Sequence, residues 1–153
     1  MTTMDDKAAL TKVAKGLHVS KGALAIAGAN TKPLFTVTVG RVLVTQILLE
    51  VTTIIQAQAD ATKLISTPTT GTAVDLCATA DITGKEAGSM WSITGVASDA
   101  MLIPNAGSVP EQLKGVIVPI GSIGINTAAN NTGAVKSDIW YFALDEGATI
   151  AAV

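Results

Sequence analysis

Charge is scarce in this sequence, and so are aromatic rings. Charged residues make up 14% of the 153 residues, whereas a typical soluble domain carries about 25%. Aromatic residues make up 3%, and the chain holds one histidine, His18, and one cysteine, Cys77. One cysteine excludes an internal disulfide, and one histidine with one cysteine does not make a zinc site. The sequence therefore argues against a disulfide framework and against histidine-based metal chemistry.

The abundant residues are those of strands and tight turns. Hydrophobic residues make up 48% of the chain, and most of them are Ala, Val, Ile and Leu, interleaved with Thr and Gly. Such a mixture favours β-structure. A chain of this length forms one domain whose core needs no covalent cross-links. A surface poor in charge is tolerated where partners cover it, because the cores of interfaces are depleted of charge. We therefore expect an assembly subunit.

The charge that is present is unevenly distributed. Residues 1–32 contain five lysines and two aspartates, a charge of +3, and residues 33–153 contain five cations and ten carboxylates, a charge of −5. A basic leader on an acidic body suggests that the leader lies on an acidic partner surface. A solvated leader with scattered lysines is the alternative.

The sequence also lacks the marks of a membrane or nucleic-acid protein. No segment offers the ~18 uninterrupted apolar residues of a membrane span, and the N-terminus lacks the basic and apolar regions of a signal peptide. Nucleic-acid binding requires a basic face with interleaved aromatic rings, whereas the body of this chain is acidic and has five aromatic residues. We therefore expect a chain that is made and used as a soluble protein, with neither a membrane nor a nucleic acid as a direct partner.

Residues 3–16 form the best helical candidate. Their apolar residues follow the spacing i, i+3, i+4 and i+7, which places Leu10, Val13, Ala14 and Leu17 on one stripe. Gly16 can end this helix in the left-handed conformation. Residues 18–32 show no steady period, and we expect them to form an extended arm or loop across the body. The predicted organisation is a helix and arm over residues 1–32 and a β-sandwich domain over residues 33–153.

A β-pattern begins after Pro33. Phe and Val alternate with Thr over Leu34–Val39, the period of a half-buried strand, and Gly40-Arg41 predicts a two-residue hairpin turn. The next run, Val42–Gln58, is nearly continuous in apolar residues, so we expect both of its faces to be covered. Its inward set is either Leu43, Thr45, Ile47, Leu49 and Val51 or the set of opposite parity. A helix over Val51–Thr62 is an alternative, which the β-branched block at its start disfavours.

Shorter runs complete the predicted β-structure. Strands are expected at Thr62–Ser66, Ala73–Ala80, Met90–Val96, Val116–Val118, Ile120–Ile125 and Ala134–Leu144, with a small apolar tail at Thr149–Val153. Residues 97–114, which contain two prolines and a glycine, form the longest predicted surface loop. Roughly eight or more short strands separated by turns are typical of an antiparallel sandwich. The expected fold is therefore all-β and jelly-roll-like, with a short N-terminal helix and an extended arm.

Three aromatic residues follow one another at Trp140, Tyr141 and Phe142. Rings of this size supply the largest buried areas available to a core. Successive side chains on a strand point to opposite faces, so Trp140 and Phe142 share one face and Tyr141 takes the other. We expect Trp140 and Phe142 to face the core and Tyr141 to lie nearer the surface.

Residues that carry enzymatic chemistry are thinly spread. His18 is expected to be a surface or contact residue, and Cys77 a small buried apolar residue. Three serines, Ser92, Ser98 and Ser122, lack a G-x-S-x-G context and would have to recruit His18. Four scattered carboxylates, Asp75, Asp81, Glu86 and Asp99, are of the kind that is usually solvated, although two of them could pair in space. We therefore predict no catalytic, cofactor-binding or metal-binding residues and a protein that is not an enzyme.

Four segments carry a resemblance to a known family. They are residues 34–44, LFTVTVGRVLV; residues 67–78, TPTTGTAVDLCA; residues 130–136, NNTGAVK; and residues 140–148, WYFALDEGA. These segments resemble a family of small virion structural proteins of tailed bacteriophages, the cement or decoration subunits of the capsid. The resemblance covers residues 33–152 and leaves residues 1–32 outside. Gly40-Arg41 stands where the family has a Gly-Gly hairpin.

The resemblance implies a protein of the virion, made in the cytoplasm of a bacterial host and located on the capsid surface. Such a subunit binds the major capsid protein from outside, stabilises contacts between capsomers and forms a homo-oligomer, commonly a trimer at three-fold positions. A tail, spike or head-fibre component uses the same kind of β-structure and is a first alternative. A small ligand-binding or hydrolytic jelly roll is a second, disfavoured because enzymes of that fold hold a metal with several histidines and this chain has one.

Overall fold

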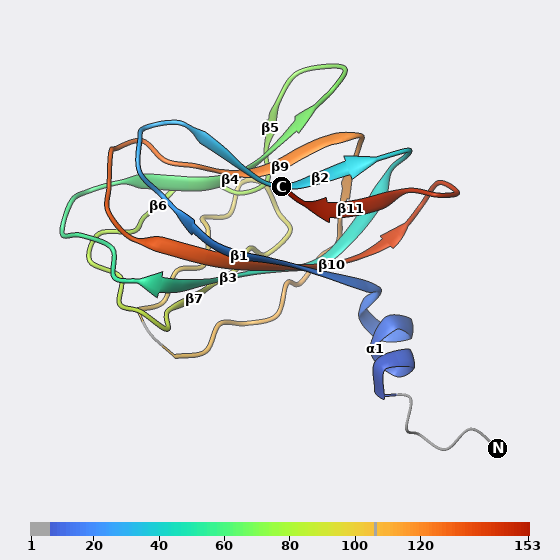
Figure 1. The fold of residues 1–153 in the computed structure, drawn as a ribbon, viewed down its shortest axis with the longest axis horizontal. Helices are drawn as coiled ribbons and strands as arrows, with labels where there is room; N and C mark the ends of the chain where they lie inside the picture. Colours follow the sequence, from blue (N-terminus) through green and yellow to red (C-terminus); the bar gives the residue numbers. More distant parts are fainter. Residues whose placement is uncertain (1–6, 106) are drawn as a thin grey trace.

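The body of the protein is a sandwich of two antiparallel sheets. The computed structural model describes residues 7–105 and 107–153, and within them eleven strands follow one short helix, α1 (Lys7–Lys15) (Figure 1). The first sheet, ordered β1-β10-β3-β7 with β8 also paired to β3, contains β1 (Leu17–Ala25), β3 (Val42–Thr53), β7 (Met90–Trp91), β8 (Val116–Val118) and β10 (Ala134–Ala143). The second sheet, ordered β11-β2-β9-β4-β5 with β6 also paired to β4, contains β2 (Thr31–Thr38), β4 (Ala61–Pro68), β5 (Val74–Asp75), β6 (Ala80–Asp81), β9 (Gly121–Asn126) and β11 (Thr149–Ala152). The predicted all-β sandwich is confirmed.

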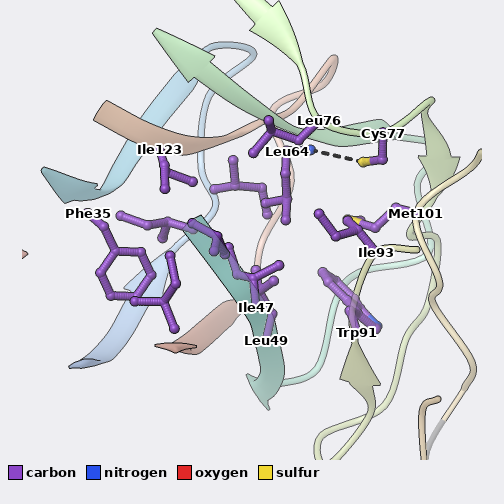
Figure 2. Close-up of a cluster of buried hydrophobic side chains, with 14 of the residues drawn as sticks. Phe35, Ile47, Leu49, Leu64, Leu76, Cys77, Trp91, Ile93, Met101 and Ile123 are labelled. Atoms are coloured by element: carbon purple, nitrogen blue, oxygen red, sulfur yellow. Dashed lines mark hydrogen bonds between the residues drawn. The ribbon is translucent and has the colours of Figure 1, made fainter. Parts of the chain in front are cut away.

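The core lies between the two sheets. Its fully buried side chains include Ile47 and Leu49 from the first sheet and Phe35, Leu64 and Ile123 from the second (Figure 2). Trp91 is the largest of the buried side chains. Cys77 is buried as predicted: the Leu64 N–H donates to its Sγ at 3.4 Å, and burial raises the pKa of its thiol. Burial of aliphatic side chains of this size contributes about 1.5–3 kcal/mol each, so this layer holds the sandwich together.

Successive strands alternate between the two sheets. β1 belongs to the first sheet, β2 to the second, β3 to the first and β4 to the second, and the alternation recurs from β8 to β11. The connections between these strands therefore cross the ends of the sandwich. The hairpin predicted at Gly40-Arg41 is wrong, because the strands on either side of it lie in different sheets. Glycine is required at position 40 for a different reason, because a Cβ there would lie 2.5 Å from the Cβ of Asp145.

β3 changes its inward parity at a β-bulge. Val44 pairs with Tyr141 and Gln46 pairs with Trp140, so Thr45 is an extra residue in β3. Such an extra residue moves every later side chain to the opposite face. The inward set is therefore Val42 and Val44 before the bulge and Ile47, Leu49 and Val51 after it. Each of the two alternative inward sets describes one half of the strand.

β10 orients its aromatic residues opposite to the prediction. Tyr141 is 3% exposed and belongs to the core, whereas Trp140 and Phe142 are half-buried on the outer face. The expected facing of these three residues is therefore wrong. The inward set of β10 is Val135, Ser137, Ile139 and Tyr141. Ser137 interrupts the apolar period of this set, and the two outward rings obscure which face is buried.

The N-terminal segment contains both a helix and a strand. Gly16, with a φ of 96°, ends α1 as predicted, and its N–H donates to the carbonyl of Lys12 at 2.9 Å. Residues 3–6 of the predicted helix lie outside the described residues. The expected arm is extended but is not a loop, because β1 pairs with β10 along one edge of the first sheet. Beyond β1, Ile26 is fully buried in the core. The sandwich therefore includes most of residues 17–32.

The remaining segments are less regular than predicted. β5, β6 and β7 are two-residue strands where longer strands were expected at residues 73–80 and 90–96. The alternative helix over residues 51–62 is wrong, because β3 and β4 occupy its two ends. Residues 97–114 contain no named strand in their described part and form the expected loop. Short pairings of this kind form one edge of each sheet.

Candidate functional site

His18 lies in a polar cluster on the outer face of the first sheet. Its ring stacks on Trp140, with ring centroids 4.5 Å apart. Its Nε2 lies 2.8 Å from Oδ1 of Asp138, and the Ser20 hydroxyl donates to the same oxygen at 2.6 Å. The sequence indicated His18 as a surface or contact residue but gave no indication of Ser20 or Asp138. The i, i+2 spacing of His18 and Ser20 in a strand would have placed them on one face, whereas Asp138 is distant in sequence.

This cluster has the residue types of a hydrolytic triad but not its geometry. A catalytic imidazole stands between serine and carboxylate, with one ring nitrogen facing each. Here Nε2 of His18 faces both groups, and the Ser20 proton is engaged by Asp138 directly. The hydroxyl is therefore not activated by the imidazole. The arrangement ties β1 to β10 at an exposed position.

The other candidate residues are engaged in separate local contacts. Ser92 is buried and donates to the Ile47 carbonyl at 2.7 Å. Three carboxylates have local partners, Asp75 with Lys63, Asp81 with Thr83 and Asp99 with Thr94. Glu86 and Ser98 are exposed, and Ser122 is half-buried. Across residues 7–105 and 107–153, no group of three or more His, Cys, Asp or Glu residues is placed to hold a metal.

One end of the sandwich gathers exposed apolar side chains. Three adjoining hollows have volumes of about 320, 300 and 380 Å³. Thr69, Thr70, Pro119 and Ile120 each line two of these hollows. The exposed apolar residues that line them are Val39, Val74, Ile117 and Ile120, each between 39% and 67% exposed. They come from the link between β2 and β3, the start of β5, and the region of β8 and the link to β9. We call this surface the apolar end.

Every charged side chain that lines the apolar end is already paired within the chain. Nε and Nη2 of Arg41 donate to Oδ2 and Oδ1 of Asp145 at 2.8 and 2.7 Å, and the Arg41 backbone N–H donates to Oδ2 at 2.7 Å. These bonds hold the pKa of Asp145 well below its usual range and raise the pKa of Arg41. Asp75 pairs with Lys63 at 2.7 Å. The surface therefore presents apolar and hydroxyl groups rather than free charge.

The apolar end also contains a strained backbone position. Val39 has a φ of 72°, in the left-handed region that β-branched residues avoid. Such a conformation costs about 1–3 kcal/mol and persists only where the surroundings impose it. The Arg41–Asp145 pair and the close approach of Gly40 to Asp145 impose it here. The strained link leaves the Val39 side chain two-thirds exposed, at 67%.

A second apolar hollow lies on the outer face of the first sheet. Leu48 of β3, Met90 of β7 and Trp140 of β10 form its floor, and residues 109–111 of the long loop form one wall. Its volume is about 380 Å³. Lys15, at the end of α1, pairs with Glu111 at the rim. We call this hollow the outer groove.

Gln112 fixes the wall of the outer groove against β3. Its Oε1 accepts from the Ile47 N–H at 3.1 Å, and its Nε2 donates to the carbonyls of Val44 at 3.2 Å and Lys114 at 2.8 Å. The Val44 and Ile47 groups lie on the edge of β3 between its pairings with β8 and β7. The amide therefore acts in place of a missing strand residue. Sequence analysis placed Gln112 in a surface loop, and no local signal marked its burial.

Lys32 is an internal cation rather than part of a solvated leader. Its Nζ donates to the Gly28 carbonyl at 2.7 Å, to Oδ1 of Asn30 at 2.8 Å and to Oγ1 of Thr127 at 2.9 Å. Burial lowers the pKa of Lys32, and the carboxylate of Asp60 acts in the opposite direction. The ammonium ties the connection between β1 and β2 to the end of β9. This lysine therefore does not add to the exposed charge of the N-terminal segment.

Comparison with known proteins found no relative of this chain. No family model, curated protein or solved structure matches this chain. Among the described residues, no helix has both the length and the apolar character needed to cross a membrane. The functional argument therefore depends on the two apolar surfaces, the apolar end and the outer groove.

Proposed function

We propose that the protein is a non-enzymatic structural subunit of a tailed-bacteriophage virion, a cement or decoration protein on the outer capsid surface. Its partner is the major capsid protein, and it binds at the junctions between capsomers. It uses the apolar end for this contact. Such a subunit stabilises the shell by bridging neighbouring capsomers, and it requires neither a cofactor nor a metal.

The observation that carries this proposal is the neutral, apolar character of the apolar end. Several exposed apolar side chains surround three hollows there, and the charges that line them are paired internally. Interface cores are depleted of unpaired charge and rich in apolar contacts. Large exposed apolar patches on soluble proteins mark interaction sites. The Val39 link supports the same conclusion, because strain is retained there while the side chain remains outside the core.

The proposal includes a homo-oligomer, most simply a trimer. The chain has 14% charged residues, which leaves few groups to keep an isolated subunit well solvated. Closed cyclic assemblies bury such surfaces between identical copies. The mass of the purified protein in solution, measured by light scattering after size exclusion, should equal three chains. A monomer at micromolar concentration would refute this part of the proposal.

Binding to the shell is tested with capsids assembled without this protein. Purified protein should co-sediment with shells of the phage whose genome encodes it. Val39→Asp and Ile120→Asp should each reduce occupancy, because a carboxylate in a desolvated interface lacks a partner. Ile54→Asp is the matched control, since Ile54 is also an exposed isoleucine but follows β3 at the opposite end of that strand.

Three outcomes decide between this function and its alternative. Loss of binding in both apolar-end variants with retention in Ile54→Asp supports the proposal. Equal binding by all three variants excludes the apolar end as the contact. A cryo-electron microscopy map of the virion that places the chain in the tail, a spike or a head fibre would overturn the decoration role and establish the alternative virion role.

A further inference from the structure

Two apolar features remain exposed in the part of the chain that the structure describes. The first is α1, whose stripe residues Leu10 and Val13 are 46% and 77% exposed. The second is the outer groove, whose floor includes Leu48, Met90 and Trp140. A nine-residue helix is marginal in water by itself, so α1 gains stability when its apolar stripe is covered.

α1 reaches the rim of its own outer groove with its last residue, Lys15, and its exit from the sheet is fixed there. Gly16 packs so closely on β10 that a Cβ there would lie 2.1 Å from the carbonyl oxygen of Tyr141. The carbonyl of Lys15 accepts a hydrogen bond from Oγ1 of Thr45 at 2.6 Å. The helix therefore leaves the sheet with a fixed exit and projects from the body (Figure 1). Folding back over the groove would break these contacts.

α1 and the body of the chain differ in charge. α1 contains three lysines and no acidic residue. Glu111 at the rim of the outer groove pairs with Lys15 of the same chain, and Glu50, two residues from Leu48 on the same face of β3, pairs with Lys136 at 3.1 Å. Residues 33–153 as a whole carry a charge of −5. A lysine-bearing helix is therefore attracted to the body of another copy by its net charge rather than by free carboxylates at the groove.

We propose that the outer groove binds α1 of a second copy of this chain. Leu10 and Val13 of one copy lie against Leu48, Met90 and Trp140 of the next. A helix of nine residues is about 13.5 Å long, so each contact is small. Because donor and acceptor surfaces differ, the contact is heterologous and closes into a ring, in which every copy gives one helix and receives one. Because a copy in a closed ring is held by two contacts at once, contacts that are weak individually give a stable oligomer.

This inference rests on the oligomeric part of the proposed function and is independent of capsid binding. Val13→Asp should weaken self-association at least about tenfold, a loss of ~1.4 kcal/mol, in sedimentation measured without shells. Val39→Asp, at the apolar end, should leave self-association unchanged. If Val39→Asp dissociates the oligomer and Val13→Asp does not, the assignment of surfaces is overturned, whether or not the protein binds capsids.

Disulfide trapping tests the contact itself. Val13→Cys and Met90→Cys proteins are mixed and oxidised, and they should give a cross-linked dimer that contains one chain of each kind. The native Cys77 is 1% exposed and does not compete. Val13→Cys mixed with Ala61→Cys is the control, because Ala61 is an exposed residue of β4 in the second sheet.

A doubly substituted Val13→Cys, Met90→Cys protein distinguishes exchange between copies from folding back. Cross-linked oligomers support the proposal, whereas a cross-link within single chains refutes it. A yield from the Val13→Cys and Met90→Cys mixture no higher than that of the control refutes it as well. As a reciprocal test, Leu10→Glu lacks a functional helix and Met90→Glu lacks a functional groove. Each alone should be monomeric, and their mixture should form a one-to-one complex. Absence of that complex contradicts the exchange.

Discussion

Replacing Gln112 with alanine should destabilise the sandwich far more than its place in a loop suggests. The change leaves the Ile47 N–H without its side-chain acceptor and removes the two donations to the carbonyls of Val44 and Lys114. An unsatisfied buried N–H costs about 1–3 kcal/mol, and each lost neutral hydrogen bond costs about 0.5–1.5 kcal/mol. The expected loss in the free energy of unfolding is therefore about 2–6 kcal/mol, a large part of the ~5–15 kcal/mol of a typical domain.

Urea unfolding followed by circular dichroism measures this loss through the shift of the midpoint at constant slope. Leu113→Ala is the matched control, because Leu113 is the next residue in the loop and is 79% exposed, and it should change stability by less than about 0.5 kcal/mol. Gln112→Glu keeps an acceptor for the Ile47 N–H, but it places a carboxylate against the carbonyls of Val44 and Lys114. This variant should therefore also destabilise the sandwich. A Gln112→Ala protein as stable as the Leu113→Ala protein would show that the amide does not complete the edge of β3.

Three further predictions concern the core, acid stability and the N-terminal segment. Tyr141→Ala should cost about 3–5 kcal/mol, as removal of a buried ring does, and Phe142→Ala should cost less; denaturant melts with the opposite order would contradict the facing of β10. The native pKa of Asp145 lies below that of the unfolded chain, about 3.9, so its contribution to stability is fully present above that pH and is lost as the pH falls through the native pKa. Acid titration of unfolding should therefore show a decline below about pH 4 that is smaller in Asp145→Asn, and identical curves for the two proteins would exclude the Arg41 pair as its cause. Deletion of residues 1–16 should leave the sandwich folded by circular dichroism, whereas deletion of residues 1–30 also removes β1 and the buried Ile26 and should cause a large loss of stability; equal melting of the two truncated proteins would mean that β1 is dispensable.

The positions of most strands could be predicted because they depend on local signals. The runs expected at residues 116–118, 120–125 and 134–144 match β8, β9 and β10 closely. Alternating apolar residues mark such strands, and glycine and proline mark their ends. The sheet in which each strand lies depends on partners far away in sequence. For that reason the Gly40-Arg41 hairpin was wrong even though both neighbouring strands were found.

The orientation of side chains was less predictable, because it depends on single extra residues. Thr45 is an ordinary β-branched residue, and nothing in the sequence distinguishes it from its neighbours in β3. Its partner strand shows it to be a bulge, and the bulge reverses the faces of everything after it. The facing of Tyr141 in β10 is matched to that register. The face on which a side chain lies is therefore determined by the pairing of two strands and cannot be predicted from the residue alone.

The composition predicted an interface but not the residues that would form it. The scarcity of charge indicated an interface, and the apolar end is consistent with that indication. Its members come from several separate segments, and its neutrality depends on the pairing of Arg41 with Asp145, 104 residues apart. The polar cluster at His18 likewise required Asp138, 120 residues away. Distances of this kind leave no trace in a single sequence.

The order of strands has a consequence for how this chain folds as it is synthesised. β10 lies between β1 and β3, and β9 lies between β2 and β4. One inner strand of each sheet is thus made late, while its neighbours leave the ribosome early with unpaired edges. Leu17 must wait for Tyr141 before β1 has a partner. Folding dominated by such distant pairings is slow, typically milliseconds to seconds. A nascent chain that stops before β9 would hold β1 and β3 without β10, and β2 and β4 without β9, the strands that join them.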